Sequence, residues 1–207
     1  MGDKYKGFAA LLNCILAGVN YFCTMRKLSM DELGRKSVEE FRQSKKTPIM
    51  VVLENIRSAY NVGSVFRTAD AFLVEGIYII GYSAKPPHKE IKKTALGAEE
   101  TVVWRHFSTS AEAIELLKAD GYTILAVEQA EGSIKLQELR PAEGQKIAVV
   151  FGNEVTGVEQ STIHLCDGVL EIPQFGMKHS LNIATAAGVV LWELVRVREL
   201  GAESQGT

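Results

Sequence analysis

Short apolar runs recur along the chain from residue 48 onward and are separated by longer mixed segments. Typical runs are IMVVL at 49–53 and IAVVF at 147–151. Uninterrupted apolar runs of this length are typical of parallel strands that are buried on both faces. The pattern therefore predicts strands over residues 49–53, 77–80, 101–104, 123–127, 147–151 and 168–172.

The segments between these runs have the period of helices. Val62, Val65 and Phe66 fall on one side of a helix predicted over residues 62–74. Further helices are predicted at 110–119 and 181–199, and residues 82–98, with two consecutive prolines, are predicted to form a loop. Strands that alternate with helices predict an α/β fold, with a mostly parallel sheet and flanking helices.

The segment before this pattern is basic. Residues 26–46 hold seven lysines and arginines against four acids, and the spacing of Leu28, Leu33, Val38 and Phe41 allows short amphipathic helices. We interpret residues 25–46 as a basic helical segment and residues 47–207 as the main domain.

The first 24 residues are a separate problem. An apolar stretch follows Lys4 and Lys6, as in a signal peptide, but it lacks a small-x-small cleavage site and is short for a membrane span of about 20 residues. Met25 opens a polar segment that is typical of an amino terminus. We therefore interpret residues 1–24 as an upstream extension from a mis-set start codon.

Composition narrows the class of protein. The chain has 207 residues and a net charge of -2, so any surface for nucleic acid must be a local patch. Cys14, Cys23 and Cys166 are scattered and form no C-x-x-C pair, which argues against a disulfide framework and against a metal site. A reducing cytoplasm fits this cysteine usage, and no membrane attachment is expected.

The common nucleotide-binding and hydrolase fingerprints are missing. No G-x-G-x-x-G follows a strand, and neither a P-loop nor a G-x-S-x-G elbow occurs. Polar groups do follow the predicted strands, at the edge where α/β sheets bind ligands. The first is N-x-G-x-x-x-R-x-A-D, in which Asn61 stands at a helix N-cap position and Arg67 is expected near the sheet end. Taken alone, this motif is better explained as a helix cap followed by a surface arginine than as part of an active site.

Two further groups follow later strands. In F-G-N-E-x-x-G, Gly152 and Gly157 allow a tight turn that exposes main-chain N–H groups, although a plain strand-to-helix turn explains the pattern equally well. In I-P-x-x-G-x-x-x-S-L-N, Ser180 suits the N-cap of the last helix. Asn182 is a poor helix former, which indicates a role beyond helix propensity. The small residues at 184–188 indicate close packing.

The three groups together, over residues 48–200, resemble the SpoU/TrmH family of SPOUT methyltransferases. The resemblance implies an α/β domain with a C-terminal trefoil knot, S-adenosylmethionine as cofactor, and methyl transfer to a ribose 2′-hydroxyl of RNA. It also implies a homodimer with the first and last helices of the domain in its interface. The RNA is expected to be tRNA or rRNA, and nothing in the sequence chooses between them.

The resemblance also implies the site residues. The expected catalytic-site residues are Asn61, Arg67, Glu154, Ser180 and Asn182. The cofactor is expected on main-chain groups of three loops, Val127 to Gln129, Gly152 to Gly157, and Ile172 to Leu181. Arg67 is expected to hold a phosphate and stabilise the developing alkoxide, because a guanidinium is always protonated and is a poor base. Glu154 is expected to fix loop geometry.

One departure from the family pattern leaves alternatives open. Ala184 stands where the family often has serine. This departure is the only support for the alternative that the chain is a non-catalytic RNA-binding or assembly protein with the same fold. The five intact site residues argue against that alternative. A SPOUT enzyme that methylates a base nitrogen and a dinucleotide-dependent oxidoreductase are weaker alternatives.

A local basic patch is present despite the acidic total. The loop at 82–98 carries Lys85, Lys89, Lys92 and Lys93, which predict contact with an RNA backbone. A solvated loop explains these lysines equally well.

Overall fold

A computed structural model describes residues 26–29, 32–34 and 36–203 of the chain. The interpreted extension, residues 1–24, lies outside the described residues. The chain divides into two compact units, Met1–Ser37 and Val38–Thr207. In the first unit, the Arg26 guanidinium pairs with the Glu32 carboxylate at 2.6 Å. The basic segment predicted at 25–46 therefore spans the boundary between the units, and its described helix is α2, Val38–Gln43, which buries Phe41.

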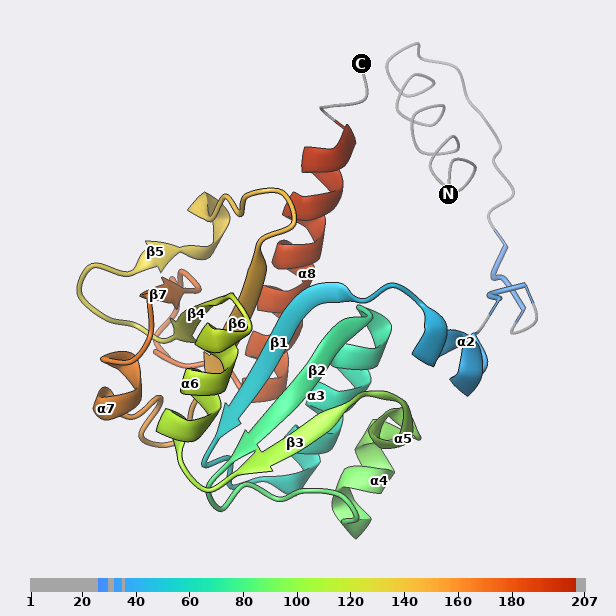
Figure 1. The fold of residues 1–207 in the computed structure, drawn as a ribbon, viewed down its shortest axis with the longest axis horizontal. Helices are drawn as coiled ribbons and strands as arrows, with labels where there is room; N and C mark the ends of the chain where they lie inside the picture. Colours follow the sequence, from blue (N-terminus) through green and yellow to red (C-terminus); the bar gives the residue numbers. More distant parts are fainter. Residues whose placement is uncertain (1–25, 30–31, 35, 204–207) are drawn as a thin grey trace. The chain divides into compact units, whose positions relative to one another are not determined.

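The second unit is built on a parallel sheet of seven strands in the order β3-β2-β1-β6-β4-β7-β5 (Figure 1). Every strand pair in it is parallel, as the sequence predicted. The strands are β1 (Thr47–Glu54), β2 (Val74–Ile80), β3 (Trp104–Phe107), β4 (Tyr122–Val127), β5 (Ile134–Lys135), β6 (Lys146–Phe151) and β7 (Gly168–Glu171).

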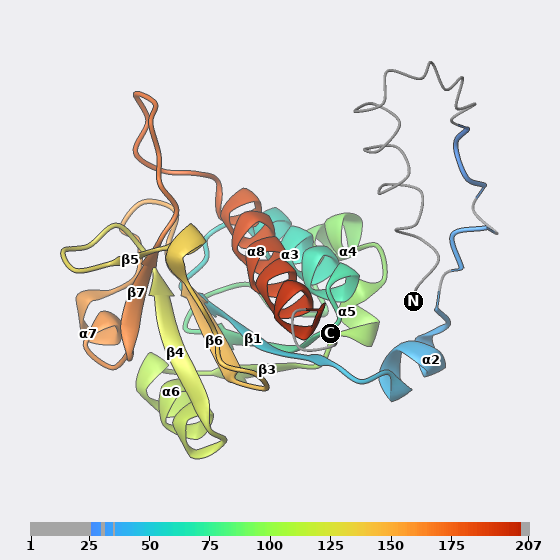
Figure 2. The same ribbon diagram turned by 90° about the horizontal axis from the view of Figure 1, so that it is seen from above.

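Helices cover both faces of the sheet (Figure 2). One face carries α3 (Ala59–Ala71), α4 (Lys89–Ala95), α5 (Ala98–Thr101) and α8 (Ile183–Glu203), and the other carries α6 (Ser110–Ala119). Each face has its own apolar core, with Phe66 and Leu194 in one and Ile114 and Leu117 in the other. These two cores explain why the strands are apolar on both sides. No helix in the described part of the chain is long and apolar enough to cross a membrane.

Several predicted boundaries are wrong by a few residues. The strand predicted at 101–104 begins at Trp104, because residues 98–101 form α5 and the Val102 N–H donates to the Ala98 carbonyl. The helix predicted at 62–74 covers 59–71, since the Ser58 side chain caps it and Leu73 adopts a positive φ of 52° beyond its end. The short elements β5, η1 (Leu136–Glu138) and α7 (Gln160–Ile163) were not predicted.

The segment at 82–98 is wrongly predicted as loop throughout. It contains α4, whose first turn is capped by the His88 side chain, which accepts a hydrogen bond from the Glu90 N–H. Ile91 and Ala95, four residues apart, are buried on the helix face that meets α3. The three lysines at 89, 92 and 93 therefore project from a helix.

A buried carboxylate joins the end of β1 to the helices on the α6 face. Glu54 is 1% exposed and accepts hydrogen bonds from the hydroxyls of Ser110, at the start of α6, and Thr162, in α7. The Glu159 N–H donates to the same carboxylate at 2.9 Å. A buried polar group needs such partners, and these partners fix the carboxyl end of β1 where the polar motifs begin.

Candidate active site

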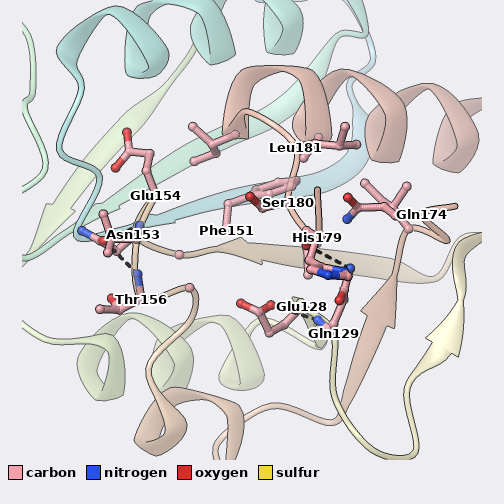
Figure 3. A pocket seen from close by; sticks show the side chains of 17 residues that line it. Glu128, Gln129, Phe151, Asn153, Glu154, Thr156, Gln174, His179, Ser180 and Leu181 are labelled. Carbon is pink, nitrogen blue, oxygen red and sulfur yellow. Dashed lines mark hydrogen bonds between the residues drawn. The ribbon is translucent and has the colours of Figure 1, made fainter. Parts of the chain in front are cut away.

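A pocket of about 340 Å³ lies at the carboxyl ends of β4, β6 and β7 (Figure 3). The pocket is lined by residues 127–129 at the end of β4, by residues 151–157 at the end of β6, by the first turn of α8 through Ile183 and Ala186, and by the loop between β7 and α8 through residues of 172–181. The last of these extends away from the sheet as a narrow loop in Figure 2. All six residues expected to hold the cofactor line this pocket, namely Val127, Gln129, Gly152, Gly157, Ile172 and Leu181.

The segment after β6 is a tight turn that only glycine fits at two positions. The main-chain N–H groups of Asn153 and Gly157 donate to each other's carbonyl at 3.0 and 2.9 Å. A Cβ on Gly152 would lie 2.2 Å from the Gly157 carbonyl, and Gly157 has a φ of +71°. The Asn153 side-chain oxygen accepts hydrogen bonds from the N–H groups of Val155 and Thr156, at 2.8 and 3.2 Å. This turn fixes the pocket wall.

Two side chains after β4 join the pocket segments to each other. The Glu128 carboxylate accepts hydrogen bonds from the N–H groups of Gln129, at 2.9 Å, and Val158, at 3.2 Å. The Gln129 amide donates to the His179 carbonyl at 3.1 Å. Glu128 thus links the β4 and β6 segments, and Gln129 links the β4 segment to the loop before α8.

The Glu154 carboxylate holds the start of α3. It accepts hydrogen bonds from the N–H groups of Arg57, at 2.9 Å, and Ser58, at 3.1 Å, and from the Asn61 amide, at 2.9 Å. Partial burial raises the pKa of the Glu154 carboxyl, but these hydrogen bonds outweigh burial, and the pKa lies below its ordinary value. A carboxylate that is occupied by donors and is hard to protonate is suited to fixing geometry, and is a weak general base.

Asn61 connects all three motifs. Its amide nitrogen donates to Glu154, and its amide oxygen accepts a hydrogen bond from the Asn182 side chain at 3.2 Å. The predicted N-cap role of Asn61 is wrong, because the Ser58 hydroxyl is the cap and accepts from the Asn61 N–H. The Asn61 side chain is thereby free to bridge the motifs.

The N-cap predicted at Ser180 is also wrong. The last helix begins at Ile183, and the Asn182 side-chain oxygen accepts a hydrogen bond from the Ala184 N–H at 2.9 Å. Asn182 is therefore the residue at the cap, which explains a poor helix former at this position. Ser180 is exposed and lines the pocket.

The structure does not bring Arg67 to the pocket of its own chain. Arg67 is exposed in the third turn of α3, eight residues and about 12 Å beyond the start of the helix. The expectation that it lies near the sheet end is wrong, because the helix starts three residues earlier than predicted and runs away from that edge. The Arg67 guanidinium makes no hydrogen bond or ion pair with any described residue.

The glycine of the first motif has a packing role. A Cβ on Gly63 would lie 2.5 Å from the Ile91 carbonyl and 2.1 Å from the Thr94 hydroxyl, both in α4. Gly63 therefore allows α3 and α4 to pack closely.

The lysines expected to contact RNA lie away from the pocket. Lys85, Lys89, Lys92 and Lys93 are exposed, and among the described residues none of them has an acid within 4.0 Å. They precede or lie in α4, on the β3 side of the sheet, whereas the pocket lies on the β7 side (Figure 1).

The sequence analysis placed Glu128, Asn153 and His179 within the expected cofactor loops but gave their side chains no role. Glu128 directly follows a buried strand, and Asn153 lies inside the second motif. Such positions are a usable signal, because polar residues at the carboxyl ends of parallel strands face the ligand edge.

The sequence matches the profile of the SpoU rRNA Methylase family over residues 48–192. The chain belongs to this family. The resemblance inferred from the three motifs is thereby confirmed.

Named relatives of this SpoU-family chain act on RNA ribose. A tRNA (guanosine(18)-2′-O)-methyltransferase of Thermus thermophilus is 31% identical over 167 residues, which are 81% of this chain and 84% of the relative. The 23S rRNA (guanosine-2′-O-)-methyltransferase RlmB of Vibrio parahaemolyticus is 28% identical over 168 residues, 81% of this chain and 66% of the relative.

Solved structures agree with the SpoU-family fold. The A. aeolicus TrmH/SpoU tRNA modifying enzyme matches with a TM-score of 0.70 at 24% identity, over 80% of this chain and 84% of that one. The AdoMet-bound rRNA methyltransferase from Sinorhizobium meliloti matches with a TM-score of 0.68 at 26% identity, over 75% of this chain and 59% of that one.

Proposed function

We propose that this chain transfers the methyl group of S-adenosylmethionine to a ribose 2′-hydroxyl of tRNA or rRNA. The carrying observation is the hydrogen-bonded chain Glu154–Asn61–Asn182, which joins the three family motifs beside a pocket at the carboxyl edge of the sheet. Relatives named as ribose methyltransferases share most of this length.

The pocket fits the cofactor. Its volume is in the range of small-ligand sites, and the tight turn at 152–157, held by its own hydrogen bonds, places main-chain atoms along one wall of the pocket. Apolar side chains of Ile172 and Leu181 line the same cavity and suit the adenine ring. When bound, S-adenosylmethionine supplies an electrophilic methyl group. The residues that would hold it are Val127, Gln129, Gly152, Gly157, Ile172 and Leu181.

The chain's own residues mainly position the reactants. Asn61 and Asn182 set the relation between α3 and α8, and Ser180 offers a hydroxyl to the ribose at the pocket rim. Methyl transfer requires in-line placement of the attacking oxygen, so positioning supplies much of the rate. Arg67 holds the adjacent phosphate and stabilises the developing alkoxide.

A homodimer is part of this proposal, with α3 and α8 in its interface. Val189 and Trp192 are exposed on α8, at 39% and 58%. An added Cβ on Gly188 would meet nothing within 4 Å, so no described neighbour packs there. Because Arg67 does not line the pocket of its own chain, the dimer is also the arrangement in which it serves the partner's pocket.

We include three further points in this proposal: the trefoil knot, the limits of the methyltransferase domain and the cellular location of the protein. The knot is supported by β7, which lies between β4 and β5 although it follows both in the chain. The methyltransferase domain is taken as residues 47–207, and the scattered cysteines favour the cytoplasm.

The direct test is methyl transfer from labelled S-adenosylmethionine to total RNA of a strain that lacks the gene, followed by digestion to nucleosides. The expected product is a labelled 2′-O-methylnucleoside. Label on a base would overturn the proposed reaction. Intact cofactor binding without label in any RNA fraction would also overturn it, and would support a non-catalytic RNA-binding role.

Arg67→Ala tests the proposed role of the cation. Turnover is expected to fall about 100-fold or more, with unchanged cofactor affinity, because a donor to developing charge is removed. Arg67→Lys is expected to retain part of the activity, and Arg105→Ala, at an exposed arginine of β3, to retain all of it. Single-turnover assays with calorimetry of cofactor binding measure both quantities. Near-normal turnover in Arg67→Ala would contradict the role.

A further inference from the structure

A second hollow of about 480 Å³ lies on the other side of the domain, between α4, α5 and the edge strand β3. Figure 1 shows these elements at the opposite end of the sheet from β7 and β5. The strand order places β3 three strands from β6, which is about 14 Å across the sheet. The hollow is therefore separate from the pocket proposed for the cofactor.

One wall of this hollow is apolar and aromatic. Pro86, Pro87 and Trp104 line it. Trp104 is the first residue of β3 and is partly buried, because it packs against the same core as α3. An anchored indole ring beside two pyrrolidine rings offers flat apolar surface, and nucleobases stack on such surface irrespective of their identity.

The α4 side of the hollow is basic. Lys89 and Lys92 line it, are exposed, and lie three residues apart on one helix, so their side chains project from neighbouring positions. Neither ammonium group hydrogen-bonds or pairs with a carboxylate in the described part of the chain. Two unpaired ammonium groups beside an aromatic wall suit the phosphate of a nucleotide whose base is stacked.

The α5 side of the hollow carries hydrogen-bond acceptors. Glu99 and Glu100 line it, and one Glu99 oxygen accepts a hydrogen bond from the Gly97 N–H at 3.0 Å. The other Glu99 oxygen has no partner among the described residues. Ionised carboxylates only accept hydrogen bonds, so this side suits a base edge that donates, as an exocyclic amino group does.

We propose that this hollow binds an unpaired nucleotide of the RNA substrate, away from the nucleotide that is methylated. The base stacks on Trp104 and the prolines, its phosphate contacts Lys89 and Lys92, and an amino group on its edge meets Glu99. The inference rests on the proposed function, because it presupposes an RNA substrate. It gives this chain a substrate-selecting site built from its own α4–α5 region.

The test measures binding of fluorescein-labelled single-stranded oligo(A) and oligo(U) by anisotropy at one fixed salt concentration. Trp104→Leu keeps an apolar side chain in the core but removes the aromatic face, and Lys92→Glu reverses one charge. Each is expected to weaken oligo(A) binding about fivefold or more. Lys135→Glu, the same charge change on β5 at the opposite sheet edge, is the matched control and is expected to leave binding near wild type.

Glu99→Gln tests the proposed contact between the Glu99 carboxylate and an amino group on the edge of the bound base. Its amide oxygen still accepts from the Gly97 N–H, while the second acceptor is lost. The ratio of oligo(A) to oligo(U) affinity is expected to fall toward one, and an unchanged ratio would contradict the role of Glu99.

Cofactor binding and steady-state kinetics on the same variants separate the two proposals. For Trp104→Leu and Lys92→Glu, we expect a raised KM for RNA with nearly unchanged kcat and cofactor affinity. If wild type methylates RNA and both variants bind and methylate it equally well, the hollow is not a nucleotide site. If wild type neither binds cofactor nor methylates RNA, the proposed function itself fails.

Photocrosslinking of wild type covers the case in which Trp104→Leu misfolds. RNA that carries 5-iodocytidine, whose base keeps an exocyclic amino group, is expected to crosslink within residues 86–104, and crosslinks confined to other segments would overturn the proposal.

Discussion

Glu154 binds the start of α3 with both of its carboxylate oxygens, and the Asn61 amide extends this contact to Asn182 at the start of α8. Glu154 and Asn182 also accept hydrogen bonds from main-chain N–H groups at the starts of α3 and α8, which a helix leaves unpaired, and the Asn61 side chain joins these two side chains to each other. The same side chains therefore stabilise the fold and align the pocket rim, so stability and activity are coupled at these positions.

Replacement of Glu154 by glutamine removes one acceptor oxygen and the charge. We expect Glu154→Gln to lower the free energy of unfolding by about 1 kcal/mol at neutral pH, or a few degrees in Tm. Because the folded pKa of Glu154 lies below its ordinary value, its stabilisation is present above about pH 4.3 and is lost as the pH falls further.

The measurement is thermal unfolding of wild type and Glu154→Gln between neutral and acidic pH. The difference in Tm between wild type and Glu154→Gln is expected to become smaller as the pH is lowered. Glu143→Gln, at an exposed loop carboxylate, is the control, and it is expected to show no gap at any pH. A gap for Glu154→Gln that stays constant down to pH 3 would contradict the assigned cause.

At the scale of elements, apolar runs predicted β1, β2, β4 and β6 well, because burial on both faces leaves a local trace in the sequence. The run predicted at 101–104 overlaps β3 at Trp104 alone, since β3 is an edge strand with little burial. Local pattern does not separate Ser58 from Asn61 as the cap of α3, since both residue types cap well. It also missed α4, whose few buried positions are surrounded by lysines. The motif residues Asn61, Glu154, Ser180 and Asn182 lie at or beside the pocket. Arg67 is the exception, because its distance from the sheet edge depends on where α3 begins.

Packing between α3 and α4 gives an element-scale prediction. Gly63→Ala places a Cβ against the α4 backbone at Ile91, so the helices must separate. We expect a loss of about 1–3 kcal/mol, seen as a Tm lower by several degrees in thermal denaturation. Ser64→Ala, at a residue whose hydroxyl bonds only within α3, is expected to be nearly neutral. Equal Tm values for the two variants would show that α4 can shift away from the added Cβ without a loss of stability.

At the scale of the whole molecule, the sequence predicted parallel strands but not their order. Pairing of β1 with β6 and of β4 with β7 joins segments that are distant along the chain, and no local pattern encodes such contacts. The pocket exists only because this order brings the ends of β4, β6 and β7 together.

The proposed dimer gives a prediction at this scale. Trp192→Glu places a charge on the exposed face of α8 and is expected to convert a dimer into a monomer in sedimentation analysis. Methyl transfer is expected to fall as far as in Arg67→Ala, since Arg67 would no longer reach the partner's pocket. Val103→Glu, at another exposed apolar residue, is the control. A wild type that sediments as a monomer while active would exclude this arrangement.

The place of β6 between β1 and β4 also constrains how the chain folds as it leaves the ribosome. Ile49 pairs with Ile147, so β1 lacks one neighbour until roughly one hundred further residues have been synthesised. Until then, β1 and β4 each present an unpaired apolar edge, which is the kind of surface that promotes aggregation. Slow translation before β6 would therefore prolong exposure of these edges, and chaperones that shield nascent chains would matter most in that interval.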